Sequence, residues 1–223
     1  WEKKIMTDCD VKAIKPVVKI DLPAGLSEKF ITGTLIMPEI TEREYPAVIF
    51  IHGMTSSERS YLKLAESLAR QNIVCLTINL RGHGRSWGNF NDLTVEDLVI
   101  DGLAAYDFLL VQHNVAKDQI GICGSSLGAA IALIVASEKK VKSLVLRTPA
   151  VYTKEMMTMK LGQIMKRQDS IFAEIKNPAK TEFMRAVAKF SGQLLVIVSA
   201  QDTIIPFLIP RAIFLKAERV EEK

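Results

Sequence analysis

Short apolar runs alternate with amphipathic stretches along most of the chain. Apolar runs of roughly four to eight residues between turn residues predict strands, and apolar positions three and four apart predict helices. The pattern predicts strands at residues 17–22, 30–37, 47–51, 73–80, 119–123, 141–146 and 194–199, and helices at 59–71, 94–112, 126–137 and 205–217. Alternating strands and helices predict an α/β fold with a mostly parallel, doubly wound sheet. The first two strands form a predicted hairpin and therefore an antiparallel edge.

Two helices carry position-specific signals. Thr94, followed by Glu96 and Asp97, is typical of a capped helix start. Pro206 and Pro210 are expected to interrupt the beginning of the last helix, because proline lacks the backbone N–H.

Residues 151–190 break the alternation. They have helical character without a clear strand and hold five of the eight methionines. We expect a small helical lid above the sheet, inserted into a single domain that covers residues 1–223. The methionines either line an adaptable apolar pocket or simply pack the lid onto the sheet.

Composition excludes several classes of protein. Hydrophobic residues make up 48% and charged residues 24%, as in ordinary globular domains, and no apolar run reaches the ~18 residues of a membrane span. The net charge of +4 is spread without a basic stripe, so no nucleic-acid partner is expected. Cys9, Cys75 and Cys123 form no CxxC pair, so no metal site or cofactor is expected. Unpaired thiols and a start without a secretory signal favour the cytoplasm.

A candidate nucleophile lies in Gly124-Ser-Ser-Leu-Gly128, which fits the pattern G-x-S-x-G. An apolar strand precedes this motif and an alanine-rich helix follows it, which is the setting of a nucleophile elbow. Ser126 would then lie at a helix N-terminus, where backbone N–H groups favour developing negative charge. The alternative is a plain glycine-rich turn with a serine cap.

Three further motifs follow other predicted strands. They are His52-Gly53-Met54, Arg81-Gly-His-Gly84 and Ser199-Ala-Gln-Asp202. Together with Gly124–Gly128 they resemble the α/β-hydrolase superfamily of serine hydrolases. The resemblance covers about residues 17–217 and is closest to the feruloyl (cinnamoyl) esterase-like and serine-aminopeptidase-like (S33) branches.

The resemblance implies a role for each residue. Ser126 would be the nucleophile, the N–H groups of Met54 and Leu127 the oxyanion hole, and Asp202 the acid that orients a catalytic histidine. His52 and His83 would be structural. Asp202 has the alternative of capping a helix. The implied function is cleavage of small acyl or aryl esters, although thioesterases, acyltransferases and peptidases use the same residues. The implied partner is therefore a small-molecule ester substrate, and the oligomeric state is open.

The histidine of such a triad is missing after Asp202. His52, His83 and His113 all precede Asp202, whereas in the family the catalytic histidine follows the acid after one more strand. We expect the native chain to continue past Lys223 with a final strand, a helix and this histidine. The alternatives are that His83 acts as the base, or that the protein is a non-catalytic binding relative.

Overall fold

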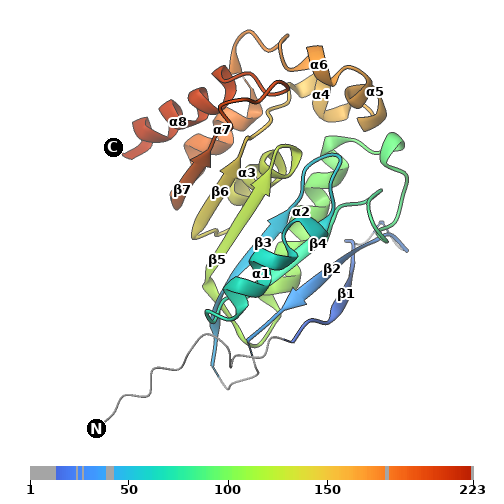
Figure 1. Cartoon of the computed structure of the whole chain (residues 1–223), viewed down its shortest axis with the longest axis vertical. Helices are drawn as coiled ribbons and strands as arrows, with labels where there is room; N and C mark the ends of the chain where they lie inside the picture. Colours follow the sequence, from blue (N-terminus) through green and yellow to red (C-terminus); the bar gives the residue numbers. More distant parts are fainter. Residues whose placement is uncertain (1–13, 24, 27, 39–42, 179–180, 222–223) are drawn as a thin grey trace.

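A seven-stranded sheet forms the centre of the computed structural model (Figure 1), which describes residues 14–23, 25–26, 28–38, 43–178 and 181–221. The strands are β1 (Val17–Asp21), β2 (Phe30–Ile36), β3 (Tyr45–Ile51), β4 (Val74–Asn79), β5 (Val115–Ser125), β6 (Ser143–Arg147) and β7 (Gln193–Ile197). Their order is β1-β2-β4-β3-β5-β6-β7. The pairs β1–β2 and β2–β4 are antiparallel, and all other pairs are parallel. The mostly parallel sheet with an antiparallel edge is thus confirmed.

Helices cover both faces of the sheet, which confirms the doubly wound arrangement. The main helices are α1 (Leu62–Ala69), α2 (Val95–Leu110), α3 (Leu127–Glu138), α7 (Glu182–Lys189) and α8 (Leu208–Glu221). On one face, α1 packs against Phe50 of β3 and Cys75 of β4. On the other face, α2 and α3 pack side by side, and α7 packs against α3 and α8. All six residues of β4 are buried because both of its faces are covered.

Helix starts follow the local signals in the sequence. Thr94 and Asp97 form a capping box before α2, as expected. The predicted helix at 59–71 is divided into a 3-10 turn, η1 (Glu58–Ser60), and α1. Helix α8 begins only at Leu208, with Pro206 before it and Pro210 in its first turn, where a missing N–H costs no hydrogen bond.

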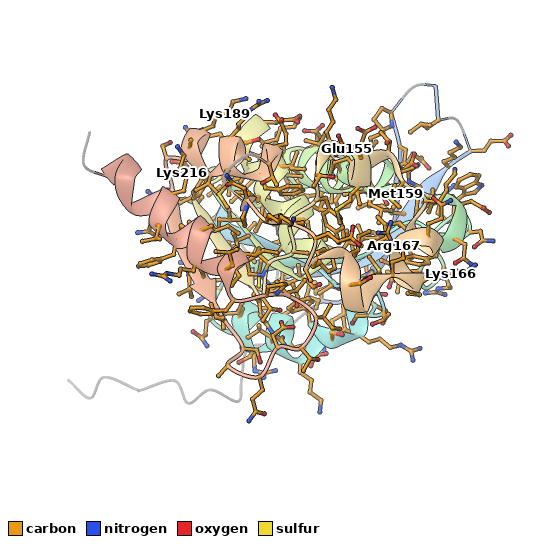
Figure 2. All side chains as sticks on the ribbon, turned by 90° about the horizontal axis from the view of Figure 1, so that it is seen from above. Glu155, Met159, Lys166, Arg167, Lys189 and Lys216 are labelled. Atoms are coloured by element: carbon orange, nitrogen blue, oxygen red, sulfur yellow. The ribbon has the colours of Figure 1, made fainter. Side chains whose placement is uncertain are left out.

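Three short helices follow β6 and lie at the top of the sheet, in the segment where a lid is predicted, and are therefore called the lid (Figure 1). They are α4 (Lys154–Thr158), α5 (Leu161–Lys166) and α6 (Gln168–Ile171). The lid is anchored by the Leu161 N–H, which donates to the Leu93 carbonyl at 2.8 Å, and by a bridge between Thr94 and Lys160. Seen from above, Met159 and Lys166 of this lid region lie on the opposite side from Lys189 of α7 and Lys216 of α8 (Figure 2). Helix α7 packs against α3 and so belongs to the helical layer beside it rather than to the lid.

Several of the sulfur-containing side chains are buried. Met156, Met157 and Met184 lie in the core, which fits the packing alternative for the methionines. Cys75 and Cys123 are free thiols, and Cys9 lies outside the described residues. Among the described residues, no helix is long and apolar enough to cross a bilayer, and no group of histidine, cysteine and acidic side chains could hold a metal ion.

Candidate active site

Ser126 occupies a sharp turn between β5 and α3. Its backbone has φ 53° and ψ −115°, a conformation that non-glycine residues rarely adopt. The turn requires glycine on both sides: a Cβ on Gly124 would lie 2.2 Å from the Gly128 carbonyl oxygen, and one on Gly128 would lie 2.2 Å from the Ile51 carbonyl oxygen. The motif therefore has the strand–turn–helix geometry expected of a nucleophile elbow.

The loop after β3 lies directly beside this turn. A Cβ on Gly53 would be 3.3 Å from the Ser125 carbonyl oxygen and 3.5 Å from the Cβ of Ser126. Within the described part of the chain, the N–H groups of Met54 and Leu127 donate to no backbone carbonyl. The loop that carries Met54 thus lies against the turn that carries Ser126 and Leu127, and the oxyanion role of the two N–H groups stays a prediction.

Two histidines hold the same loop in place. The His52 ring is fully buried; its Nδ1 lies 2.8 Å from the Gly53 carbonyl oxygen, and its Nε2 accepts the Leu80 N–H at 3.2 Å. Nδ1 therefore carries the proton. Burial lowers the pKa of His52 to about 4, with a smaller contribution from His83, so its ring is neutral at physiological pH.

His83 contacts His52 edge-on, with ring centroids 4.7 Å apart. Its Nε2 lies 2.7 Å from the Met54 carbonyl oxygen, and its Nδ1 lies 3.1 Å from the Arg81 carbonyl oxygen. Both ring nitrogens of His83 thus face backbone oxygens. Since His52 and His83 contact the carbonyls of Gly53 and Met54, they fix the loop that carries the candidate oxyanion donor.

Asp202 follows β7 and lies at the same end of the sheet as Ser126, with β6 between the two strands. Its Oδ1 accepts the N–H groups of Ile204 at 2.9 Å and Ile205 at 2.8 Å. Asp202 therefore caps a turn ahead of α8, which begins only at Leu208, and its role as the acid of a triad stays a prediction. Among the described residues, its Oδ2 accepts no hydrogen bond.

No histidine in the described chain is placed to activate Ser126. His52 and His83 are engaged with the backbone as above. His113 is exposed in the connection from α2 to β5, at the end of β5 opposite Ser126. The geometry gives no support to His83 as a base, because its Nε2 is directed at a carbonyl.

Sequence reasoning missed a buried ion pair behind this loop. Arg81 and Asp101 are both fully buried, and Arg81 donates to the Asp101 carboxylate from Nε at 2.6 Å and from its backbone N–H at 2.8 Å. Arg81 Nη2 also donates to the Asp97 carbonyl. Burial raises the pKa of Asp101 to about 7, and Arg81 opposes that shift. The one signal in the sequence is a carboxylate on the apolar face of α2.

A second missed group is Glu58, which anchors segment 53–61. Its carboxylate accepts hydrogen bonds from the side chains of Thr34 at 2.9 Å, Thr77 at 3.1 Å and Asn79 at 2.9 Å. The Glu58 N–H donates to the Asn79 side chain at 3.1 Å. This network ties η1 to β2 and β4 and so positions Tyr61 at the start of α1.

A cavity of about 300 Å³ opens beside Ser126. Segment 53–61 forms one wall, Arg147 at the end of β6 forms another, and Tyr152 and Phe172 of the lid region close it. A smaller cavity of about 110 Å³ contains Asp202. Ile204 lines the first cavity, and the next residue, Ile205, lines the second.

Comparison of the structure with solved structures finds the same fold. The protein Est1E of Butyrivibrio proteoclasticus, solved with ferulic acid bound, superposes with a TM-score of 0.70 at 20% identity and covers 89% of this chain and 85% of its own. An esterase of Pyrococcus furiosus gives a TM-score of 0.70 at 22% identity, covering 93% of this chain and 79% of its own.

Sequence relatives match only part of their own length. An uncharacterized protein of Mycobacterium tuberculosis is 31% identical over 117 residues, which is 52% of this chain but 41% of that protein. A probable alcohol acetyltransferase of Cyberlindnera fabianii is 30% identical over 100 residues, or 44% of this chain and 25% of that protein.

The sequence profile of one family matches residues 43–196, a segment that contains β3 through most of β7, including Ser126 and the loop at Met54. Because this match spans more than half of the chain and the fold agrees, the protein belongs to the serine aminopeptidase S33 family of α/β-hydrolases.

Proposed function

We propose that this chain forms the body of a serine hydrolase that cleaves carboxylic esters with small acyl or aryl groups. The observation that carries the proposal is the backbone of Ser126, held at φ 53° beside a cavity and against the Gly53 loop. Such strain is retained where it presents a side chain for chemistry.

The proposed reaction is acyl transfer. The Ser126 hydroxyl attacks the ester carbonyl, and the resulting oxyanion accepts hydrogen bonds from the N–H groups of Met54 and Leu127. The N-terminus of α3 adds its favourable dipole. Collapse of the tetrahedral intermediate releases the alcohol with a proton, and water then hydrolyses the acyl-enzyme to free acid and Ser126.

We assign the proton transfers to a histidine oriented by Asp202 and located outside these 223 residues. Two observations support this assignment. Both histidines near Ser126 are engaged with backbone carbonyls, and Asp202 keeps Oδ2 free of hydrogen bonds from the described residues. A serine hydroxyl without a base is a weak nucleophile, so an activity assay requires a protein that contains this histidine.

The test is intact-mass analysis after incubation with a fluorophosphonate, using the chain with any residues that its gene encodes after Lys223. We expect one adduct, mapped to Ser126, and hydrolysis of p-nitrophenyl esters. Ser126→Ala should abolish both, while Ser125→Ala, the matched neighbour, should keep the adduct. An adduct that survives Ser126→Ala would reject the nucleophile.

A second candidate function is binding without turnover. It is favoured by the engagement of His52 and His83, which leaves Ser126 without a base among the described residues. This function predicts no fluorophosphonate adduct in the longest encoded chain, with ester ligands bound but not cleaved. Thioesterase and peptidase activities use the same triad and are distinguished by substrate panels.

A further inference from the structure

Two buried tyrosines have hydroxyl groups in different surroundings. Tyr106 of α2 is 2% exposed, and its hydroxyl donates to the Lys140 carbonyl at 2.6 Å. Tyr152, in the connection from β6 to α4, is 1% exposed, and its hydroxyl makes no hydrogen bond with any described residue. A buried hydroxyl is nearly always hydrogen-bonded in a folded protein, so the hydroxyl of Tyr152 points to a partner outside the chain.

The hydroxyl oxygen of Tyr152 reaches the cavity beside Ser126. Among the described residues, the fully enclosed side-chain oxygen and nitrogen atoms without a hydrogen bond of normal geometry belong to Tyr61, Arg81 and Asn114. The oxygen of Tyr152 is not one of these enclosed atoms, so it touches open space although almost all of the residue is covered. Tyr152 lines the cavity of about 300 Å³ that contains Ser126, and this cavity is the open space that the oxygen meets.

Neighbouring contacts hold the ring of Tyr152 in place. Its centroid lies 5.6 Å from that of Phe172, in an edge-on contact, and 5.9 Å from that of Phe183. Phe172 lines the same cavity. Two residues before Tyr152, the Ala150 N–H donates to the Ser126 carbonyl at 3.3 Å, which fixes this segment against the elbow. The hydroxyl is therefore held at the cavity before any ligand binds.

The chemistry of this hydroxyl fits an uncharged ligand group. Burial raises the pKa of Tyr152 above its ordinary value, so the phenol keeps its proton and can donate a hydrogen bond. The same burial would penalise a charged ligand group at this place, because a charge taken out of water needs compensation. An ether or hydroxyl oxygen accepts a hydrogen bond without carrying a charge.

We propose that Tyr152 determines specificity by donating a hydrogen bond to an uncharged oxygen on the acyl chain, so that the preferred substrates are esters of short alkoxy or hydroxy acids. The inference rests on the proposed function and adds its substrate class. The scissile carbonyl lies at Ser126, and the acyl chain extends toward Tyr152 and Phe172, which close the cavity. This closed end suits the acyl chain, because the alcohol has to leave before water can enter. A hydrocarbon acyl chain would leave the hydroxyl without a partner, which is the basis for discrimination.

The test is calorimetric binding of two benzyl esters to the Ser126→Ala variant of the full encoded chain, in which no turnover consumes the ligand. Benzyl methoxyacetate and benzyl butyrate have acyl chains of the same length, and the first has an ether oxygen where the second has a methylene group. We expect the methoxyacetate to bind about five- to tenfold more tightly, as one hydrogen bond to an otherwise unpartnered hydroxyl would give. Adding Tyr152→Phe, which keeps the ring in place, should remove this preference.

Tyr106→Phe is the matched control, because it also removes a hydroxyl from a buried tyrosine. That hydroxyl is hydrogen-bonded to the backbone in the free protein, so we expect a lower melting temperature and an unchanged preference. For Tyr152→Phe we expect the reverse, an unchanged melting temperature and a lost preference. A marked fall in the melting temperature of Tyr152→Phe would show that the hydroxyl has a structural partner, and would overturn the inference.

The binding results can also overturn the inference directly. Equal binding of the two esters, or a preference that survives Tyr152→Phe, would do so. Equal weakening of both esters by Tyr152→Phe would do so as well, since the hydroxyl would then contact the ester group that both share. A fluorophosphonate adduct at Ser126 without preference for the methoxyacetate rejects only the substrate class; this preference without an adduct rejects only the hydrolase mechanism.

Discussion

Ser126 holds a conformation that its own local preferences oppose. Residues in such regions of φ and ψ typically cost about 1–3 kcal/mol, which the surrounding contacts must offset. Here the Ser126 N–H donates to the Arg147 carbonyl, and the Ser126 carbonyl accepts the N–H groups of Ala129 at 3.0 Å and Ala130 at 3.2 Å. The elbow is thus tied to β6 and to the first turn of α3.

The first prediction concerns the close approach at Gly128. Gly128→Ala places a methyl group against the Ile51 carbonyl, which is backbone and cannot rotate away. We expect a loss of roughly 3 kcal/mol or more in the free energy of unfolding, measured by urea denaturation, together with loss of fluorophosphonate labelling. Ser137→Ala in the same helix is the control and should cost less than about 1 kcal/mol. A stable, fully labelled Gly128→Ala protein would contradict the geometry.

His52 gives a prediction about pH. Its pKa is about 4 in the folded state and near 6.5 when exposed, so the unfolded chain binds the proton first as pH falls. Neutral His52 therefore contributes fully to the free energy of unfolding above pH 6.5. This contribution declines as the pH falls toward 4, by roughly 3 kcal/mol in total. Chemical denaturation at several pH values should show this decline.

Carboxylates also affect stability as the pH falls, so a substitution is needed to separate the contribution of His52 to the pH dependence from theirs. His52→Gln should flatten the pH dependence between pH 6.5 and 4 relative to the parent protein. His113→Gln, which alters an exposed ring, should leave the curve unchanged. Parallel curves for the parent and His52→Gln would mean that His52 is not buried as a neutral ring.

At the scale of elements, α2 is tied to the end of β4 by the Arg81–Asp101 pair. Removing one partner of a buried pair typically costs about 3–5 kcal/mol, because the other charge stays buried without compensation. Asp101→Asn is therefore expected to lower the free energy of unfolding by that amount, as measured by denaturant titration.

The matched control lies two turns further along α2. Asp107 pairs with Lys139 at 2.6 Å, but its side chain is 55% exposed. Asp107→Asn should cost less than about 1 kcal/mol, since water screens exposed pairs. Equal losses for the two variants would show that burial does not govern the Arg81–Asp101 interaction.

The elements and the elbow were predictable because they depend on local patterns. Buried strands, the Thr94 cap and the glycine spacing around Ser126 are each encoded within a few neighbouring residues. The Glu58 network was not predictable, because Glu58 contacts Thr34 and Thr77, 24 and 19 residues away. The assignment of α7 to the layer beside α3 is likewise a tertiary contact that periodicity cannot reveal.

At the scale of the whole molecule, we expect the protection of backbone amides against hydrogen exchange to fall from the centre of the sheet toward β7. Every residue of β4 is buried, whereas Gln193, Leu195 and Ile197 of β7 are exposed. Native-state hydrogen exchange, read by mass spectrometry, should show β4 exchanging at least a hundredfold more slowly than β7, because local opening of β7 exposes less buried surface. Helix α3, with ten buried residues, should follow β4. Uniform protection across the sheet would contradict this gradient.

The walls of the cavity have separate supports. Segment 53–61 is secured by Glu58 on β2 and β4, and the lid is secured by Leu93 and Thr94 ahead of α2. The hydrogen bonds of Glu58 and the contacts of the lid with Leu93 and Thr94 share no residue. Over evolutionary time, or in a laboratory recombination library, one wall can therefore be exchanged while the other keeps its shape, and ligand preference can diverge on one side of the cavity at a time.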